Sequence, residues 1–271
     1  MKKIYIVFIA LLISCSKSDN ASDENDDQIQ NSLLIKEIIY EDAENDNYSY
    51  KDEYFYDGTK IERYVSTSYN NNVLSTTTTH SFTYTNNLIV EKKSTYNQQS
   101  TDTYKFSYDT SGRLTQSTYC YDDSSCGNPD RSVFTYSNSN KTITVEEYIE
   151  GNLSFRTILQ RDTNNNVINV QSTSLANNSI ATTTLQYDNF NSPFLHITGA
   201  TELIFPSTFL TSSGIIAMSN NCVLYQDEED NYTINYSYDY NDDRYPRQVV
   251  LNSGGSYNSN MTLRYVSVNN N

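Results

Sequence analysis

An internal repeat of about 26 residues constrains the fold of this chain more than any other feature of its sequence. Its signature is an aromatic residue or Leu, then any residue, then Tyr. It recurs at intervals of 24 to 28 residues, and one interval of 51 residues corresponds to two periods with one copy lost. The copies end at Tyr56, Tyr84, Tyr108, Tyr136, Tyr187, Tyr238 and Tyr265, and a degenerate copy ends at Arg161. The fold is therefore expected to consist of similar units joined in series.

Each repeat has the pattern of a β-hairpin. In one copy Tyr104, Phe106 and Tyr108 alternate with polar residues, which is the two-residue period of a half-buried strand. The polar turn 109–112 contains Asp and Gly, which favour tight turns, and the second strand follows at 113–119. Other copies have Asp-Gly, Asn-Asn or Asn-Asn-Asn at the equivalent turn.

These units predict an all-β domain over residues 32–271, an antiparallel meander of about sixteen strands that forms a curved or barrel-like sheet. Sheets of more than about ten strands tend to curl. The chain has 25 Tyr, and Ala, Leu and Glu are too scarce outside 198–220 for long helices. The side chains expected to face the inside are Tyr56, Tyr84, Phe106, Tyr108, Phe134, Tyr136, Tyr187 and Tyr238.

A transmembrane barrel is the competing architecture. Its lipid-facing side would need Leu and Val, whereas the face opposite the aromatic residues here is made of Thr, Ser, Lys and Glu. The sequence therefore favours a barrel-like domain outside the bilayer.

The run Tyr-Asp-Thr-Ser-Gly-Arg-Leu at 108–114 resembles the YD repeat of RHS-type proteins. Degenerate copies begin at Arg161, Tyr187 and Tyr238. With its Asn- and Tyr-rich repeats, the region 32–271 resembles a group of Gram-negative outer-membrane lipoproteins that is classed as a domain of unknown function with a porin-like β fold. The resemblance implies a fold and a location, and it brings no catalytic residue.

The N-terminus has the pattern of a lipoprotein signal. Two Lys precede the apolar run 4–13, which ends in Leu-Ile-Ser-Cys and resembles the lipobox of bacterial lipoproteins. We expect residues 1–14 to be a signal peptide and Cys15 to be lipidated. Residues 15–31 then form an acidic flexible tether. The acidic stretch is either a signal for the outer face of the outer membrane or a plain spacer, and the sequence leaves both interpretations open.

Three further cysteines remain in an oxidising compartment. Cys120 and Cys126 flank a five-residue loop and are candidates for a disulfide bond. Cys222 would then be a buried, inert residue.

The repeat is interrupted near 198–221, the most apolar stretch after the signal. This irregular insertion is expected to plug the interior with a short helix or to cover an open sheet end, and the alternative is a ligand-binding lid. We favour the plug.

Composition excludes several functions. The net charge of −15 makes nucleic acid a poor partner. The two His, His80 and His196, are far apart and carry no attached motif, and the acidic cluster 227–230 has the pattern of a hairpin tip rather than a calcium loop. We therefore expect no metal site, no cofactor and no enzymatic activity.

The sequence thus predicts a lipid-anchored protein of the outer membrane that faces outward and acts as a binding or adhesion module for a glycan or a protein. Two alternatives stay open. One is an envelope-structural lipoprotein without an external ligand, and the other is a polysaccharide-acting hydrolase with acids in the barrel mouth.

Overall fold

The fold is described by a computed structural model over residues 32–42, 48–122, 129–137, 139–204, 206–212, 215–254 and 258–268. These residues form sixteen β-strands and one short helix. In chain order the elements are β1 (Ser32–Asp42), β2 (Tyr48–Asp57), β3 (Lys60–Asn70), β4 (Val73–Thr85), β5 (Leu88–Tyr96), β6 (Ser100–Tyr108), β7 (Leu114–Cys120), β8 (Asp130–Ser137), β9 (Thr142–Ile149), β10 (Asn152–Arg161), β11 (Val167–Ser174), β12 (Ile180–Tyr187), α1 (Pro206–Leu210), β13 (Cys222–Asp227), β14 (Tyr232–Tyr240), β15 (Pro246–Asn252) and β16 (Asn258–Val268).

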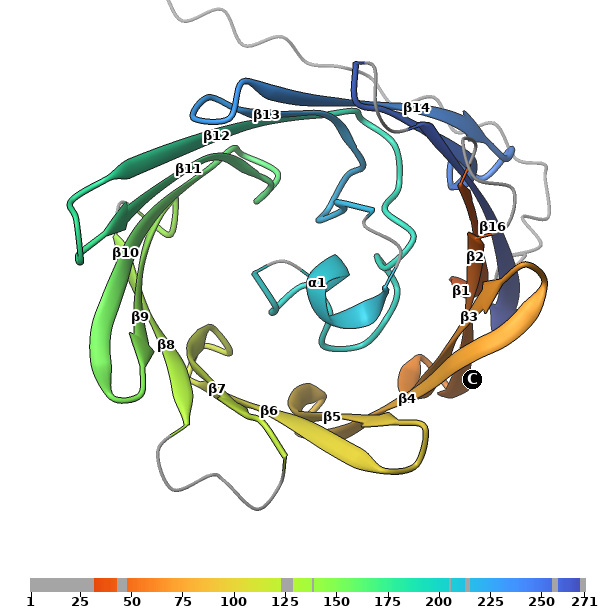
Figure 1. Cartoon of the computed structure of the whole chain (residues 1–271), viewed down its shortest axis with the longest axis horizontal. Coiled ribbons are helices and arrows are strands. Elements are labelled where there is room, and N and C mark those ends of the chain that lie inside the picture. Colours follow the sequence, from red (N-terminus) through yellow and green to blue (C-terminus); the bar gives the residue numbers. More distant parts are fainter. Residues whose placement is uncertain are drawn as a thin grey trace, which may run out of the picture.

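The strands close into a barrel. Every strand pairs antiparallel with its neighbours in the sequence, and β1 pairs with β16 to complete the ring (Figure 1). The predicted meander of about sixteen strands is therefore confirmed, and the sheet is closed rather than merely curved. Closure removes the exposed sheet edges at which other chains could pair.

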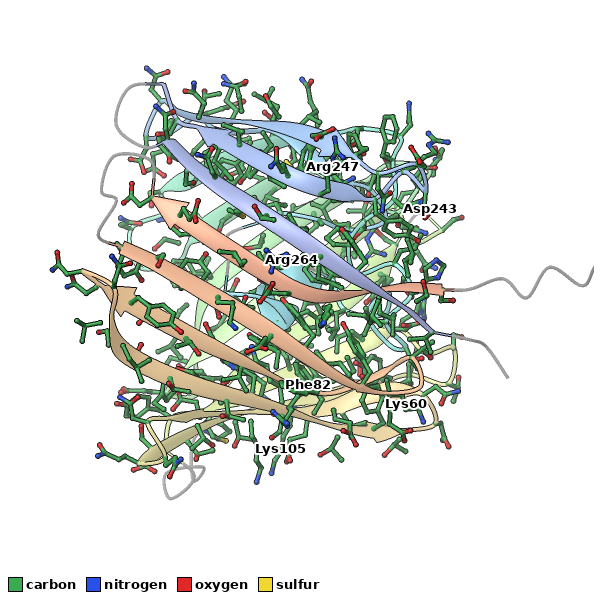
Figure 2. The ribbon with its side chains drawn as sticks, turned by 90° about the vertical axis from the view of Figure 1, so that its right-hand side faces the viewer. Lys60, Phe82, Lys105, Asp243, Arg247 and Arg264 are labelled. Carbon is green, nitrogen blue, oxygen red and sulfur yellow. The ribbon has the colours of Figure 1, made fainter. Side chains whose placement is uncertain are left out.

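Alternate turns lie at opposite ends of the barrel. We call the end where β1 begins at Ser32 the proximal end, and the opposite end the distal end. The turns after β2, β4, β6, β8, β10 and β14 lie at the proximal end, and Figure 2 shows Lys60 and Asp243 there. The remaining turns, including that between β3 and β4, lie at the distal end.

The Asp of the Tyr-Asp motif shapes the proximal turn. Asp109 Oδ1 accepts hydrogen bonds from the backbone N–H groups of Ser111, at 2.9 Å, and Arg113, at 3.0 Å. Gly112 has a φ of +79°, which Gly adopts without strain. Asp162 accepts two backbone hydrogen bonds in the same way, and Asn241 accepts one, from the N–H of Tyr245. The side chain thus holds a five-residue turn together at several points of the array.

The repeated Tyr joins two neighbouring strands beyond the point where their backbone pairing ends. The pairing of β5 with β6 stops at Glu91 and Lys105, and beyond it Tyr108 Oη donates to the carbonyl oxygen of Ile89 at 2.7 Å. The same bond is made by Tyr56 to Ile35, Tyr136 to Leu114, Tyr238 to Cys222 and Tyr265 to Pro246. In these five repeats the hydroxyl satisfies a backbone carbonyl beyond the end of the ladder, which accounts for Tyr rather than Phe there. Tyr84 Oη instead accepts from the backbone N–H of Ile61, and the buried Tyr187 Oη has no partner among the described residues.

Tyr108→Phe is expected to lower the free energy of unfolding by about 1 kcal/mol, because it removes one hydrogen bond and leaves the ring in place. Urea titration followed by tyrosine fluorescence measures the change. Tyr69→Phe on the outer face is the matched control, because its hydroxyl has no hydrogen bond to the described residues. Equal stability of the two variants would contradict the proposed role of the hydroxyl.

The barrel interior is the hydrophobic core. Phe106 is buried in it, and the other seven side chains predicted to face inward pack against it. The outer wall is polar, and Lys105 and Arg264 lie on it in Figure 2. It carries ion pairs such as Arg156 with Glu146, at 2.8 Å, and Arg264 with Glu37.

The segment 188–221 joins β12 to β13, and we call it the plug, because its described residues enter the barrel. Figure 1 shows α1 inside the ring of strands. Plug residues Leu203, Leu210 and Ala217 are almost completely buried. The irregular insertion near 198–221 therefore lies within the interior. Among the described residues, no helix has the length and apolar character needed to cross a membrane.

Candidate ligand-binding site

Two cavities border the plug toward the distal end. The first, which we call the tyrosine pocket, has a volume of about 290 Å³. Ser212 of the plug lines it together with residues of the barrel wall, namely Tyr40, Tyr48, Tyr50, Tyr232, Ile234, Tyr236, Leu251, Ser253 and Ser259. Tyr48 and Tyr232 begin their strands at the distal end, so the pocket is open on that side.

Strand pairing creates the aromatic surface of the tyrosine pocket. Tyr40 on β1 lies directly opposite Tyr50 on β2, and their rings stack with centroids 4.5 Å apart. Tyr48 meets Tyr50 edge to face at 6.4 Å. Burial, followed by the charge of Asp52, raises the pKa of Tyr50 above its ordinary range, so its hydroxyl stays protonated at neutral pH. These rings offer flat apolar faces with hydroxyl groups beside them.

The second cavity, which we call the acid pocket, has a volume of about 430 Å³. Its wall comes from β7 to β11, and the plug closes one side with Ile204, Thr208 and Phe209. Most of its lining is apolar, as at Phe134 and Leu159. The remaining lining residues are Leu114, Ser117, Ser132, Val145, Glu147, Thr157, Val170 and Ser172.

Glu147 is the ionisable residue of the acid pocket. It follows Val145 at the next inward position of β9, whereas Glu146 between them faces outward and pairs with Arg156. Burial raises the pKa of the Glu147 carboxyl, and a hydrogen bond with Thr157 opposes this shift. The described residues that line the pocket include no cation to neutralise this carboxylate.

A buried polar cluster fastens the plug to the wall. Asp52 on β2 is completely buried, and its Oδ2 accepts hydrogen bonds from Thr211 Oγ1 and from the backbone N–H of Ser212, both at 2.8 Å. Lys92 on β5 is buried too, and its Nζ donates to Tyr64 Oη at 3.3 Å. His80 stacks on the Tyr64 ring at 4.1 Å, and its Nδ1 lies 2.8 Å from Ser94 Oγ.

Burial dominates the titration of this cluster. It raises the pKa of Asp52, lowers the pKa of Lys92 to about 7, and lowers the pKa of His80 to about 2. The positive charge of Lys92 lowers the pKa of His80 further, so this ring is neutral at physiological pH. Asp52, Lys92 and His80 fasten the plug and line neither pocket, and the cluster reaches the tyrosine pocket only through Ser212.

Raising the pH from 7 to 9 is expected to stabilise the protein by about 2 kcal/mol through Lys92 alone. Below pH 7 both folded and unfolded states hold the Lys92 proton. Between pH 7 and the ordinary Lys value of 10.5 mainly the unfolded state holds it, so stability rises with pH. Urea unfolding at the two pH values measures this gain, and Lys92→Met is expected to lack it. An equal pH response in the variant would refute the assignment.

A third cavity, of about 330 Å³, lies at the proximal end and is mainly polar. It is lined by Arg161, which stands where the other repeats have Tyr, together with Arg113, Glu202 and neighbouring polar residues. Arg161 Nε is buried without a hydrogen-bond partner among the described residues, and burial lowers the pKa of this side chain. Glu202 supplies a carboxylate to the same cavity, and Arg113 is already paired with Asp109 at 2.6 Å.

Of the four cysteines, the structure describes Cys120 and Cys222. Cys15 and Cys126 lie outside the described residues. Cys120 is disulfide-bonded, and its pairing with Cys126 stays a prediction. Cys222 is free and buried, and burial raises its pKa to about 12, so its thiol is protonated at neutral pH.

The acidic tip forms a turn, and His196 lies near an aromatic ring. In the tip between β13 and β14, Asp227 Oδ1 accepts the backbone N–H groups of Glu229 and Asp230, which is the geometry of a turn. Among the described residues, no group of three His, Cys, Asp or Glu side chains is placed to hold a metal ion. His196 belongs to the plug, and its ring lies 6.0 Å from that of Tyr245.

Sequence reasoning did not single out Asp52, Lys92 or Glu147. All three occupy inward positions of their strands, and each pairs with an apolar or aromatic residue on a neighbouring strand, namely Ile38, Phe82 and Phe155. The sequence signal for these residues was a charged side chain at a strand position that the two-residue alternation assigns to the core.

Comparison with known proteins supports the fold. No protein-family model matches the chain, and no curated protein matches it significantly. Among solved structures the chain is similar to the crystal structure of a porin-like protein from Bacteroides uniformis, with a TM-score of 0.53 and 14% identity. The match covers 86% of this chain and 97% of that one. At this identity the likeness concerns the β-barrel fold alone.

Proposed function

We propose that this protein is a lipid-anchored, non-enzymatic binding module of the outer membrane, and that its plugged barrel takes a ligand into the pockets at its distal end. The observation that carries the proposal is the presence of two cavities beside the plug, on different parts of the barrel wall, one faced with Tyr rings and the other mainly apolar. Concave sites of this size, with few polar groups among apolar ones, are typical of small-molecule binding.

A conducting pore is a poorer account of this barrel. The plug and the wall together bury Leu34, Phe194 and Leu203 in one continuous core. The outer wall carries Arg156, Glu146 and Arg264, and each Arg at the middle of a bilayer would cost about 2 to 4 kcal/mol. A barrel with this wall is more stable beside the membrane than within it.

The position of Ser32 gives the binding site an orientation. β1 begins at the proximal end, so residues 15–31 connect the proposed lipid on Cys15 to that end. The pockets lie toward the distal end, which points away from the point of attachment. This arrangement suits a module that presents its site to the medium rather than to its own membrane.

Exposed apolar side chains surround the distal end. Val73 and Leu74 at the turn between β3 and β4 are 67% and 58% exposed, and Tyr121 is 70% exposed. Ile149 and Ile180 are exposed at the same end. A glycan or protein larger than the pockets would contact this rim, which supports binding or adhesion.

The lining of the two pockets supports the non-enzymatic part of the proposal. Glu147 is the ionisable carboxyl group of the acid pocket, and the tyrosine pocket contributes Tyr hydroxyls. A hydrolase of the two-carboxylate type needs a second acid close to the first. The described lining of the acid pocket offers none.

A screen of glycan and protein arrays with residues 16–271 tests the proposal, with a hydrolase panel run in parallel. Ser172→Trp should fill the acid pocket and weaken binding, whereas Thr173→Trp on the outer face of β11 should not. Turnover that one carboxylate substitution abolishes would favour the hydrolase. No binding in the arrays together with no turnover in the hydrolase panel would favour an envelope-structural role.

The anchor has its own test. Cys15→Ala should release the protein from the membrane fraction, and protease treatment of intact cells should digest the unmodified protein if it faces outward. Firm membrane association of the variant after signal cleavage would disprove lipid anchoring.

A further inference from the structure

We propose that the acid pocket selects amphiphiles that combine an apolar chain or ring with one protonated amine, the amine lying beside Glu147. This inference rests on the proposed function, because it names the class of ligand for one of the two pockets. It depends on the lining of the pocket, on the position of Glu147 within it, and on the charge of the chain.

The apolar part of the ligand is specified by the lining. Phe134, Val145, Leu159 and Val170 supply the wall, and Phe209 of the plug closes the side. The Phe209 ring is fixed in place, because it meets the rings of Tyr104 and Phe106 edge to face at 5.5 and 5.0 Å. Because the cavity of about 430 Å³ has this apolar lining, filling it with an apolar group is more favourable than filling it with water.

The polar part is specified by Glu147. This carboxylate is partly removed from water, and no cationic residue lines the described pocket, so its negative charge is not compensated there. A ligand ammonium would form a charge-assisted hydrogen bond and neutralise it, whereas a ligand carboxylate would add a second buried negative charge. The net charge of −15 for the whole chain acts in the same direction, because it attracts cations to the barrel.

Hydroxyl groups provide the remaining contacts. Ser117, Ser132 and Ser172 line the same cavity from β7, β8 and β11. Ser132 lies directly opposite Glu147 in the pairing of β8 with β9, so a hydroxyl stands next to the carboxylate. An ammonium group has three donors, and the carboxylate and this hydroxyl can accept two of them.

Decylamine, decanol and decanoate, used below their aggregation concentrations, test the inference, because they share a chain length and differ in their head group. Binding to the lipid-free mature chain is measured by calorimetry at constant ionic strength. Decylamine should bind about 10-fold more tightly than decanol, and decanoate should bind most weakly. Glu147→Gln should remove the advantage of the amine over the alcohol.

Glu146→Gln is the matched control, because this neighbour on the same strand faces outward and has the same charge. It should preserve the preference, and Ser172→Trp should abolish binding of all three probes. Equal affinities for amine and alcohol, or a preference that survives Glu147→Gln, would overturn the inference while leaving the binding module intact. Failure of all three probes to bind would instead contradict the proposed function for this pocket.

Discussion

Asp52→Ala is expected to lower the free energy of unfolding by about 3 to 5 kcal/mol, the largest loss from any single substitution considered in this barrel. The carboxylate holds Thr211 and Ser212 of the plug at 2.8 Å each, and its charge is the one that stabilises the buried Lys92 ammonium. Removing it leaves two donors without acceptors and a buried amine without its counter-charge. Urea unfolding followed by circular dichroism measures the loss.

Two companion variants separate the hydrogen bonds from the charge. Asp52→Asn keeps an oxygen for the Thr211 hydroxyl and the Ser212 N–H but removes the charge, so its loss should be smaller than that of Ala. The double variant Asp52→Ala, Lys92→Met should be more stable than the sum of the two single losses implies, because each single change leaves the other group buried alone. Strict additivity would show that Asp52 and Lys92 do not interact.

Much of this barrel could be predicted because the repeat encodes it. Tyr104, Phe106 and Tyr108 alternate with polar residues, and a two-residue period admits only one inward face for each strand. The turn after Tyr108 carries Asp109 and Gly112, which fix its length and hence the register of the next strand. Local residues therefore determine each hairpin, and repetition extends it to the whole wall.

The functional pockets could not be predicted in the same way, because they depend on contacts between distant parts of the chain. Thr211 meets Asp52 across 159 residues of sequence, and no periodic pattern links the two. Phe209 closes the acid pocket from a segment without strand alternation. The inward position of Glu147 was readable from its strand, but its isolation from any cation becomes visible only when five strands and the plug are assembled.

Gly199→Ala is expected to cost about 2 to 4 kcal/mol of stability, because Gly199 lies where the plug touches the turn between β4 and β5. Its φ is +78°, a conformation that disfavours a Cβ. An added Cβ would stand 2.9 Å from the carbonyl oxygen of Asn87 and 3.1 Å from the backbone nitrogen of Ile89. The first atom belongs to a tight turn in which Asn86 and Asn87 already have positive φ, and the second belongs to the paired strand β5, so neither can move easily.

Comparison with Gly112→Ala separates the cost of the contact between the added Cβ and the wall from the conformational cost. Gly112 has nearly the same φ, +79°, but an added Cβ there would meet nothing within 4 Å, so only the conformational cost of about 1 to 2 kcal/mol should appear. The difference between the two variants then measures how firmly the plug packs against the wall. A plug that packs firmly gives the larger loss at Gly199 and, because the plug forms one side of both pockets, weaker ligand binding as well. Equal losses at the two positions would mean that the plug yields to the added methyl group, and the pockets beside it would then be adaptable rather than preformed.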